Sequence, residues 1–524
     1  MAEKNYNNIP KEKFSFVHAG DRIADKKLDD KPISYFKDAW IRFRKSKASV
    51  IAAVIIIVIV LYSLMAPLLI PHDPTFMCSN YAKKPGRVTW LRDIGIATGG
   101  VKKNTNEATY IKLRGIAVAA EYDGETVLSL GEAKDSDYQA ILRTGRVYEQ
   151  ELPGKRYANY FPATIDTYLE VGFVYLSIEQ QEYKRIMEWQ EQTGLQILYP
   201  LIENNEYCFD ANDANFWYKT KAKGAMPVRI NDSGKAVQMN FSEELVLEEN
   251  YKRDSDGNLV YYQFTGGGNV ETAQYKVRAL YYNYYQYLYG MEPNYLMGTD
   301  SQGYDLALRI AGGIQLSLIV AISVSVINFI LGAAYGAVEG YYGGWIDITL
   351  CRITDILSGV PFMVVATLFQ IHLAKQVGAI PSLLFAYVLT GWIGTAGRVR
   401  TQFYRFKNQE YVMAARTLGA RDSRIIWKHI FPNTLGTIIT SSALVIPGVI
   451  LSESMLSFLG IIKLGNAEQT SLGTLLSDAS SIWTSYPHLM LYPALIISLL
   501  MVCFNLFGNG LRDAFNPALR GVED

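Results

Sequence analysis

Long apolar runs separated by polar segments dominate the pattern of this chain. The first run, residues 48–70, contains no charged residue. An α-helix rises about 1.5 Å per residue, so roughly 20 apolar residues cross a hydrocarbon core of about 30 Å. Five more runs follow, at residues 312–338, 360–374, 382–397, 435–461 and 487–508. The pattern predicts six membrane-spanning helices. The third run is short, and we expect its helix to extend into the polar segment before it.

A cleaved signal peptide is the alternative interpretation of the first run. Such a peptide would lie at the extreme N-terminus, would be shorter, and would end at a small-residue cleavage site. Here residues 1–47, most of them polar, precede the run. The sequence therefore favours a retained span.

The distribution of Lys and Arg predicts the orientation of the spans, because cations next to a span stay in the cytoplasm. Before the first span stand Arg42, Arg44, Lys45 and Lys47. Six spans then place both termini in the cytoplasm, together with the loop between spans four and five. That loop carries Arg398, Arg400, Arg405, Lys407, Arg416, Arg421, Arg424 and Lys428. The charge pattern and the number of spans therefore predict the same orientation.

By the same orientation, residues 72–296 lie outside the cytoplasm. This segment has no long apolar run, is rich in aromatic residues and carries more Asp and Glu than Lys and Arg. It reads as a folded α+β domain rather than a linker. Asp123-Gly124 predicts a β-hairpin within residues 110–130, and residues 254–257 predict a second turn between strands.

The same segment holds a predicted helix and a tract dense in tyrosine. A capping box at residues 177–180 should open the helix and Gly194 should end it. Residues 281–289 contain six tyrosines. Two interpretations of this tract are open: an aromatic platform for a peptide or a partner protein, or an element packed on the membrane interface, where Tyr is favoured. The second is preferred.

Composition and charge argue against several classes of protein. The chain has 50 Lys and Arg and 50 Asp and Glu, which argues against a nucleic-acid binder. No GxxxxGK[ST] loop is present, so we expect no ATP hydrolysis by this chain. No nucleophile–base pair or pair of carboxylates stands out, and the five His are scattered. We therefore expect no catalytic residue, no bound metal and no cofactor.

Four cysteines occur, and two of them, Cys78 and Cys208, lie in the segment predicted to be outside the cytoplasm. A disulfide is permitted there. Two cysteines without a visible framework leave open whether they pair. The other two, Cys351 and Cys503, lie in or near predicted spans.

The predicted cytoplasmic loop holds the most informative motif, at residues 410–433. It predicts two short helices around a break. Ala414 and Ala415 give the first helix a small face, and Gly419 can end it with a positive φ. The second helix should run from residue 423 to 430 and stop at Pro432. Small residues on one side and cations on the other suit insertion into a groove of a partner, although an ordinary solvated basic loop has the same composition.

The order of residues resembles the coupling-helix motif of bacterial ABC importer permeases, in which two alanines precede a glycine and, later, a proline. In that family the loop docks in a cleft of the cytoplasmic ATPase. The acidic residue usual before the alanines is replaced by Met413, while Glu410 remains nearby. The resemblance implies a coupling site formed by Glu410, Met413, Ala414, Ala415, Gly419, Ala420, Arg424 and Pro432.

Further segments resemble the second, C-type permease of dipeptide, oligopeptide and nickel importers, over residues 30–71 and 296–520. They are Gly298–Asp305 with Arg309 and Ser317-Leu318, Gly340–Asp347 with Arg352, Asp355 and Pro361, Ser454–Gly460, and Asn509–Asp513 with Pro517. The family usually has Arg where Tyr304 stands. Residues 470–483 look like the short helix that the family has on the outer side after the fifth span.

Several residues in the spans are candidates for packing or for the pore. Gly332, Gly336 and Gly340 form a small-residue stripe suited to close helix packing. Asp347, Arg352 and Asp355 flank the third span and could pair with each other or with a partner permease. Glu453 is the only charge in the fifth apolar run. An acid within a membrane is a functional candidate, and a hydrogen-bonded packing role is equally open.

The resemblance implies an α-helical polytopic fold of the type I ABC importer permeases, with a large extracytoplasmic α+β insertion. We expect a cytoplasmic segment at 1–47, a first span at 48–71, the insertion at 72–296, and a permease core at 297–524 with the coupling loop at 399–434. The chain would be a transport subunit in the bacterial cell membrane rather than an enzyme.

The implied partners are a sister permease, two cytoplasmic ATPases that use ATP and magnesium, and an extracellular substrate-binding lipoprotein. The expected cargo is a di- or oligopeptide. Nickel or another small solute is the alternative cargo, and a membrane-anchored sensor or adhesion protein is the alternative of a different class.

Overall fold

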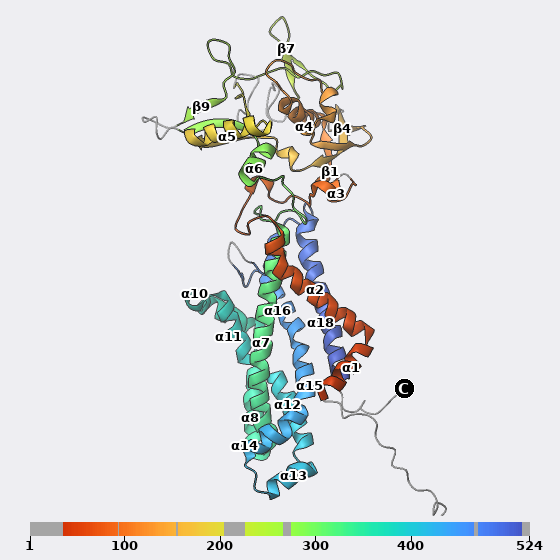
Figure 1. The fold of residues 1–524 in the computed structure, drawn as a ribbon, viewed down its shortest axis with the longest axis vertical. Coiled ribbons are helices and arrows are strands. Elements are labelled where there is room, and N and C mark those ends of the chain that lie inside the picture. Colours follow the sequence, from red (N-terminus) through yellow and green to blue (C-terminus); the bar gives the residue numbers. More distant parts are fainter. Residues whose placement is uncertain are drawn as a thin grey trace, which may run out of the picture.

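The computed structural model describes residues 35–92, 94–153, 156–203, 226–265, 274–465 and 470–515. The molecule is elongated, with all of its strands at one end and a bundle of long helices below them (Figure 1). The strands lie between the first and second long helices of the chain. The segment that separates the first two apolar runs is therefore a folded α+β unit.

Among the described residues, five helical segments are long and apolar enough to cross a membrane, or six if one bent pair counts as a span. The prediction of six spans therefore falls at the upper end of this range. The segments are α2 (Lys47–Leu69), α7 (Leu306–Tyr342), α11 and α12 (Ala379–Thr390 and Ile393–Phe406), α14 to α16 (from Asp422 to Phe458), and α18 (Pro487–Ala514).

The bent pair corresponds to the short third run. It consists of α8 (Gly344–Ser358) and α9 (Phe362–His372), which meet at 71°. The segment before the third run is helical, as expected, but it is a separate helix, so the prediction that one helix continues through it is wrong. Pro361 lies at the break, and proline cannot donate the backbone hydrogen bond that would join the two helices. The short α10 (Ala374–Val377) leads from α9 to α11.

The core of the bundle forms around α7, which packs against α2, α12 and α16. Many of its buried side chains in the half nearer the strands belong to one apolar cluster with residues of α16 and α18. The predicted short helix after the fifth span is α17 (Leu472–Ala479). It lies so close to α16 that a Cβ on Gly473 would fall 2.6 Å from the Cα of Ser454. The helix before the first span, α1 (Tyr35–Lys45), packs on α18.

Two four-stranded antiparallel sheets and a hairpin form the unit between α2 and α7. In the first sheet β4 (Arg156–Asp166) pairs with β1 (Gly100–Asn106), β2 (Ile141–Thr144) and β3 (Tyr148–Leu152). In the second, β10 (Gln274–Leu280) pairs with β5 (Phe173–Glu179), β6 (Leu198–Tyr199) and β9 (Tyr262–Thr265). The hairpin joins β7 (Val228–Ile230) to β8 (Ala236–Gln238).

The predicted β-hairpin around Asp123-Gly124 is wrong. Its first half is the helix α4 (Glu107–Ala120), capped by the Asn106 side chain, which accepts a hydrogen bond from the Thr109 amide. Nearly every residue of this helix from Tyr110 onward is buried. A segment that is apolar on all sides carries no periodicity that separates a buried helix from strands.

The other local predictions in this unit have mixed outcomes. The turn at residues 254–257 is confirmed, with Arg253 and Leu259 bridged across it. The helix that ends at Gly194 is α5 (Gln180–Thr193), and Gly194 has a φ of 73°. The predicted capping box is wrong, because Ser177 lies in β5 and pairs with Lys276.

The tyrosine tract forms α6 (Tyr281–Tyr289), and its buried side chains face the interior of the α+β unit. Tyr281 and Tyr285 pack there against Tyr81. The tract is thus a core element, which neither interpretation of the sequence anticipated. Cys78 is buried in the same cluster with its sulfur 2.9 Å from the Tyr281 hydroxyl. Its possible partner Cys208 lies outside the described residues.

Short helices and turns complete the described chain. They are η3 (Ser79–Tyr81), α3 (Thr89–Arg92), η4 (Glu132–Asp135) and η5 (Leu169–Val171).

Candidate functional site

The predicted coupling loop forms the tip of the bundle farthest from the strands (Figure 1). It contains α13 (Glu410–Thr417), the turn at Gly419, α14 (Asp422–Arg424) and a π-helical turn at Ile425–Ile430. We call residues 410–433 the coupling tip. Its first helix and its break match the sequence prediction.

Gly419 ends the first helix for a physical reason. Its φ is 79°, a conformation that costs a residue with a Cβ about 1–2 kcal/mol. The amide of Ala420 donates to the Ala415 carbonyl at 3.1 Å, and the Gly419 amide donates to Arg416 at 3.0 Å. These bonds satisfy carbonyls left open at the helix end.

The prediction that Pro432 stops the second helix is wrong. The helical segment runs on from Asp422 to Phe458 through the first turn of α15 (Phe431–Ala443), where Pro432 lies. The π-helical turn comes directly before it, and the Phe431 amide bonds to the Ile426 carbonyl, five residues back. A turn of this kind shifts the hydrogen-bond register where proline cannot donate, so the helix continues.

Most of the predicted coupling residues are exposed. Among them Ala415 and Ala420 are half-buried, and the rest, Glu410, Met413, Ala414, Gly419, Arg424 and Pro432, are exposed. Leu418, which the motif did not single out, has 88% of its surface exposed. Leu418 therefore adds one large apolar side chain to the exposed surface of the tip.

The tip is fixed to the bundle by buried side chains below that surface. Val412, Ile425 and Ile430 are fully buried against Ala337 of α7 and Phe403 of α12. The Tyr341 hydroxyl, at the end of α7, donates to the Asp422 carboxylate at 2.6 Å. A displacement of the tip would therefore be transmitted directly to α7 and α12. Sequence spacing could not identify this contact, because Tyr341 and Asp422 are far apart in the chain.

The small-residue stripe of α7 faces α12. A Cβ on Gly332 would lie 2.7 Å from the Thr395 Cβ, and one on Gly336 would lie 2.3 Å from the Ala396 carbonyl oxygen. Gly340 is equally close to Phe403. Contacts this short let two backbones approach as small residues do in membrane helix pairs.

Asp347 pairs with Arg400 of α12 rather than with Arg352. The Arg400 guanidinium donates to both carboxylate oxygens at 2.6 and 2.7 Å, and the Tyr404 hydroxyl donates at 2.7 Å. Arg352 and Asp355 instead form an exposed pair at 3.2 Å. The sequence left open whether Asp347, Arg352 and Asp355 pair with each other or with a partner permease, and it did not identify Arg400 as the partner of Asp347 within this chain.

Asp347 also lies near Glu339 and Cys351, and the ligand atoms of these three fall within 4.8 Å of one another. Arg400 lies 3.7 Å from the Glu339 carboxylate. The Cys351 thiol donates a hydrogen bond to the same carboxylate at 2.7 Å. A cation and a thiol proton already satisfy these carboxylates. The cluster therefore fits an ion-pair network better than a metal site.

Glu453 is fully buried between α16 and α7. Its carboxylate accepts hydrogen bonds from the hydroxyls of Ser317 at 3.1 Å and Ser457 at 3.0 Å. Only 1% of its surface is exposed. Within this chain the geometry fits the packing role that the sequence left open.

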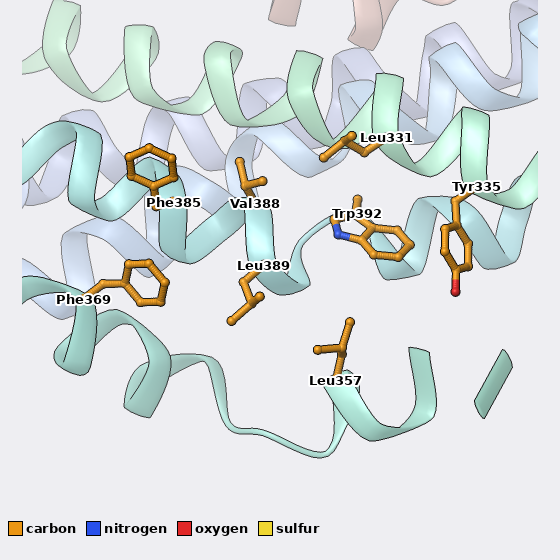
Figure 2. A pocket seen from close by; sticks show the side chains of 8 residues that line it. All are labelled: Leu331, Tyr335, Leu357, Phe369, Phe385, Val388, Leu389 and Trp392. Carbon is orange, nitrogen blue, oxygen red and sulfur yellow. The ribbon is translucent and has the colours of Figure 1, made fainter. Parts of the chain in front are cut away.

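A concave apolar surface lies on the side of α7 where the broken helix pair stands away from the bundle. We call it the α7–α11 groove, with a volume of about 430 Å³. Figure 2 shows its lining, drawn from α7, α8, α9, α11 and the start of α12: Leu331, Tyr335, Leu357, Phe369, Phe385, Val388, Leu389 and Trp392. Aromatic rings from α7, α9, α11 and the start of α12 gather around it.

Comparison with known proteins supports the same picture. Residues 336–521 match the family of binding-protein-dependent transport system inner membrane components, and residues 34–85 match the N-terminal membrane domain of oligopeptide transport permease C. The oligopeptide transport permease OppC of Bacillus subtilis is 39% identical over 223 residues, which are 43% of this chain and 72% of that protein. The chain belongs to this permease family.

Other members of the permease family match to a similar degree. The dipeptide transport permease DppC of Bacillus subtilis is 41% identical over 43% of this chain and 68% of its own length. OppC of Haemophilus influenzae is 42% identical over 43% of this chain and 71% of its own. The solved methionine transporter MetNI, in an inward-facing state, aligns with 40% of this chain and 96% of its own at a TM-score of 0.33 and 15% identity.

The residues just before α7 that resemble the permease family form a connected set of contacts. Asp300 accepts hydrogen bonds from the amides of Gln302, Gly303 and Tyr304, and its carboxylate pairs with Arg309 at 3.2 Å. Tyr304, where the family usually has Arg, places its ring 4.6 Å from the Arg309 guanidinium. Gly303 is required because a Cβ there would lie 2.0 Å from the Cys78 carbonyl oxygen. This motif anchors the α+β unit to α7.

Proposed function

We propose that this permease is one of two transmembrane subunits of an ATP-driven importer whose cargo is a di- or oligopeptide. The cargo follows from the names of its relatives, which are oligopeptide and dipeptide transport permeases. The observation that carries the proposal is the coupling tip, which exposes the predicted docking residues on a base buried against α7 and α12. A motor protein that binds this tip would act directly on the helices of the bundle.

In this proposal two cytoplasmic ATPase subunits supply the energy, using ATP and magnesium, and one of them receives the coupling tip. Closure of the ATPases on ATP would move the tip, and α7 and α12 would follow because Val412, Ile425 and Tyr341 hold it to them. The bundle would then alternate between two discrete arrangements. The chain itself carries out transport and no catalysis.

The sister permease would cover the apolar surface that this chain leaves open. The α7–α11 groove is lined entirely by apolar and aromatic side chains. A helix of a second permease, rather than lipid alone, would bury Trp392 and Phe385 in a specific contact.

The proposed orientation places the α+β unit outside the cytoplasm and both termini inside. Its support is the charge distribution: the cations of α1 and of the coupling tip lie in the half of the bundle away from the strands (Figure 1). We propose four parts: a cytoplasmic segment at 1–47, a span at 48–71, the outer domain at 72–296, and the permease core at 297–524.

We propose that the outer domain docks or orients the substrate-binding lipoprotein above the pore. The structure offers a precise way to remove it. Arg87 and Tyr295 pair as antiparallel neighbours, with amide-to-carbonyl distances of 2.9 and 2.8 Å in the two directions. Residues 88–294 can therefore be replaced by a short glycine–serine linker. Normal membrane levels of this variant with unchanged uptake and binding-protein affinity would contradict the docking role.

Uptake of labelled peptides tests the proposed function. Cells with and without this chain would be given labelled di-, tetra- and longer peptides, with nickel as a second cargo. Peptide uptake that depends on the chain, with nickel uptake unaffected, is the expected result. Peptide uptake that is the same in both cells would contradict the proposed cargo, and chain-dependent nickel uptake would then identify the alternative.

A further inference from the structure

The helix α1 has a surface that no described part of the chain covers. It packs on α18 through Ala39 and Phe43, each 4% exposed. Beside this contact, Trp40 is 60% exposed with its ring stacked on Phe43, and on the opposite side Ile41 is 41% exposed.

Cations surround these two apolar side chains. Lys37, Arg44 and Lys45 are exposed and, within the described part of the chain, form no ion pair. Arg42 differs, because it pairs with Asp38 one turn earlier on the same helix. The uncovered face of α1 therefore mixes two apolar side chains with three cations.

The position of α1 places this face at the boundary of the membrane. Ser46 alone separates α1 from the span α2, and the side chains packed on α1 come from the last turns of α18 and the first turns of α2. Gly510 and Ser49 are in contact at that level, since a Cβ on Gly510 would lie 2.0 Å from the Ser49 hydroxyl oxygen. Because α1 is joined to a span and packed on the end of another, it lies at headgroup depth.

We propose that α1 is an interfacial helix that binds anionic phospholipid headgroups. Trp40 and Ile41 would enter the region between headgroups and acyl chains, where Trp is favoured. Lys37, Arg44 and Lys45 would reach the phosphates, as long cationic side chains do at a membrane surface. The proposal rests on the proposed function only for the orientation that makes this leaflet the cytoplasmic one.

Charge and continuity favour lipid over a partner protein as the occupant. A protein partner would have to supply carboxylates for three separate cations, whereas an anionic leaflet supplies phosphates all around the helix. The adjoining span α2 also leaves apolar side chains uncovered, since Ile51 and Val54 are 59% and 53% exposed. The lipid that covers those side chains would also cover Trp40.

The test uses the full-length chain, purified with its partner subunits and placed in nanodiscs. The nanodiscs contain phosphatidylcholine alone or an equal mixture with phosphatidylglycerol. One variant carries Lys37→Gln, Arg44→Gln and Lys45→Gln. The control carries Lys134→Gln, Lys184→Gln and Arg229→Gln, which remove three exposed cations of the outer domain. Native mass spectrometry would then count the phosphatidylglycerol retained by each protein.

We expect the α1 variant to lose phosphatidylglycerol affinity by roughly tenfold or more, since each cation near an anionic surface contributes a severalfold factor. The control should retain it. A second measurement uses brominated lipids. The fluorescence of Trp40, obtained as the difference between the wild-type chain and the Trp40→Phe variant, should be quenched by them. Equal lipid retention in both triple variants, or an unquenched Trp40, would overturn the proposal. Loss of a partner subunit instead of lipid would show that a protein covers α1.

These outcomes are separate from those of the transport assay. A complex that retains phosphatidylglycerol through α1 and imports no peptide would contradict the proposed function and support the lipid site. A complex that imports peptide and has no lipid preference at α1 would support the proposed function and contradict the lipid site.

Discussion

Arg400 of α12 holds Asp347 of α8 through two hydrogen bonds of 2.6 and 2.7 Å. The same guanidinium lies 3.7 Å from the buried carboxylate of Glu339 on α7. One cation thus joins three helices at the end of the bundle that carries the coupling tip. Arg400 was identified in the sequence only as one of several loop cations, and the structure gives it a specific role.

Removal of this cation should destabilise the bundle. Arg400→Gln leaves two carboxylates without a counter-charge, and we expect a loss of about 1–3 kcal/mol, since Arg400 is only partly buried. The measurement is thermal unfolding in detergent. Arg352→Gln is the matched control, because the Arg352–Asp355 pair is exposed and such pairs contribute little. Equal melting temperatures for the two variants would contradict the role assigned to Arg400.

A methyl group on Gly336 should separate α7 from α12. The added Cβ would lie 2.3 Å from the Ala396 carbonyl oxygen, and overpacking of this kind costs about 1–3 kcal/mol. Gly312→Ala on the same helix meets no atom within 4 Å and should be neutral or stabilising, since alanine favours helix. A Gly312→Ala variant that unfolds more easily than Gly336→Ala would contradict the close contact between α7 and α12.

Glu453 offers a test of packing against a role in the pore. Glu453→Leu leaves the hydroxyls of Ser317 and Ser457 unpaired, and we expect a loss of about 1–3 kcal/mol in stability. Glu453→Gln keeps an acceptor for these hydroxyls and should retain most of the stability and uptake. A Gln variant that is stable but transports no peptide would show instead that the negative charge itself is used.

The Cys78 thiol should resist alkylation. Burial raises the pKa of Cys78 above its usual value, and the thiolate is the reactive form. At pH 8 a maleimide should label Cys78 slowly in the folded protein and quickly after denaturation, with labelling faster as pH rises toward the raised pKa. Mass spectrometry of the peptide that contains Cys78 gives the rate. Rapid labelling of the folded protein would contradict the buried position against Tyr281.

The sequence predicted well what depends on local pattern. The apolar runs predicted the long helices, and Gly419 and Gly194 predicted helix ends, since a positive φ is a local property of glycine. It predicted poorly what depends on distant contacts. The partner of Asp347 lies 53 residues away, whereas the sequence suggested pairing with the nearby Arg352 or with a partner permease.

Two other errors have a similar cause. Residues 110–120 lacked a distinguishing period because the helix they form is buried on nearly all sides. Pro432 was expected to stop a helix, but a π-helical turn before it accommodates the ring. A change of hydrogen-bond register leaves no mark in the order of residues, so it could not be predicted from the sequence.

The most direct test of the central claim, that the coupling tip connects this permease to its ATPases, is peptide uptake by a Gly419→Arg variant. Gly419 has a φ of 79° and open space around it, so the arginine would project from the exposed tip into the proposed dock. Gly419→Asn is the control, because asparagine tolerates this backbone conformation and is short. With both proteins at normal levels in the membrane, we predict that Gly419→Arg abolishes uptake and Gly419→Asn retains it. Normal uptake by Gly419→Arg would contradict the account.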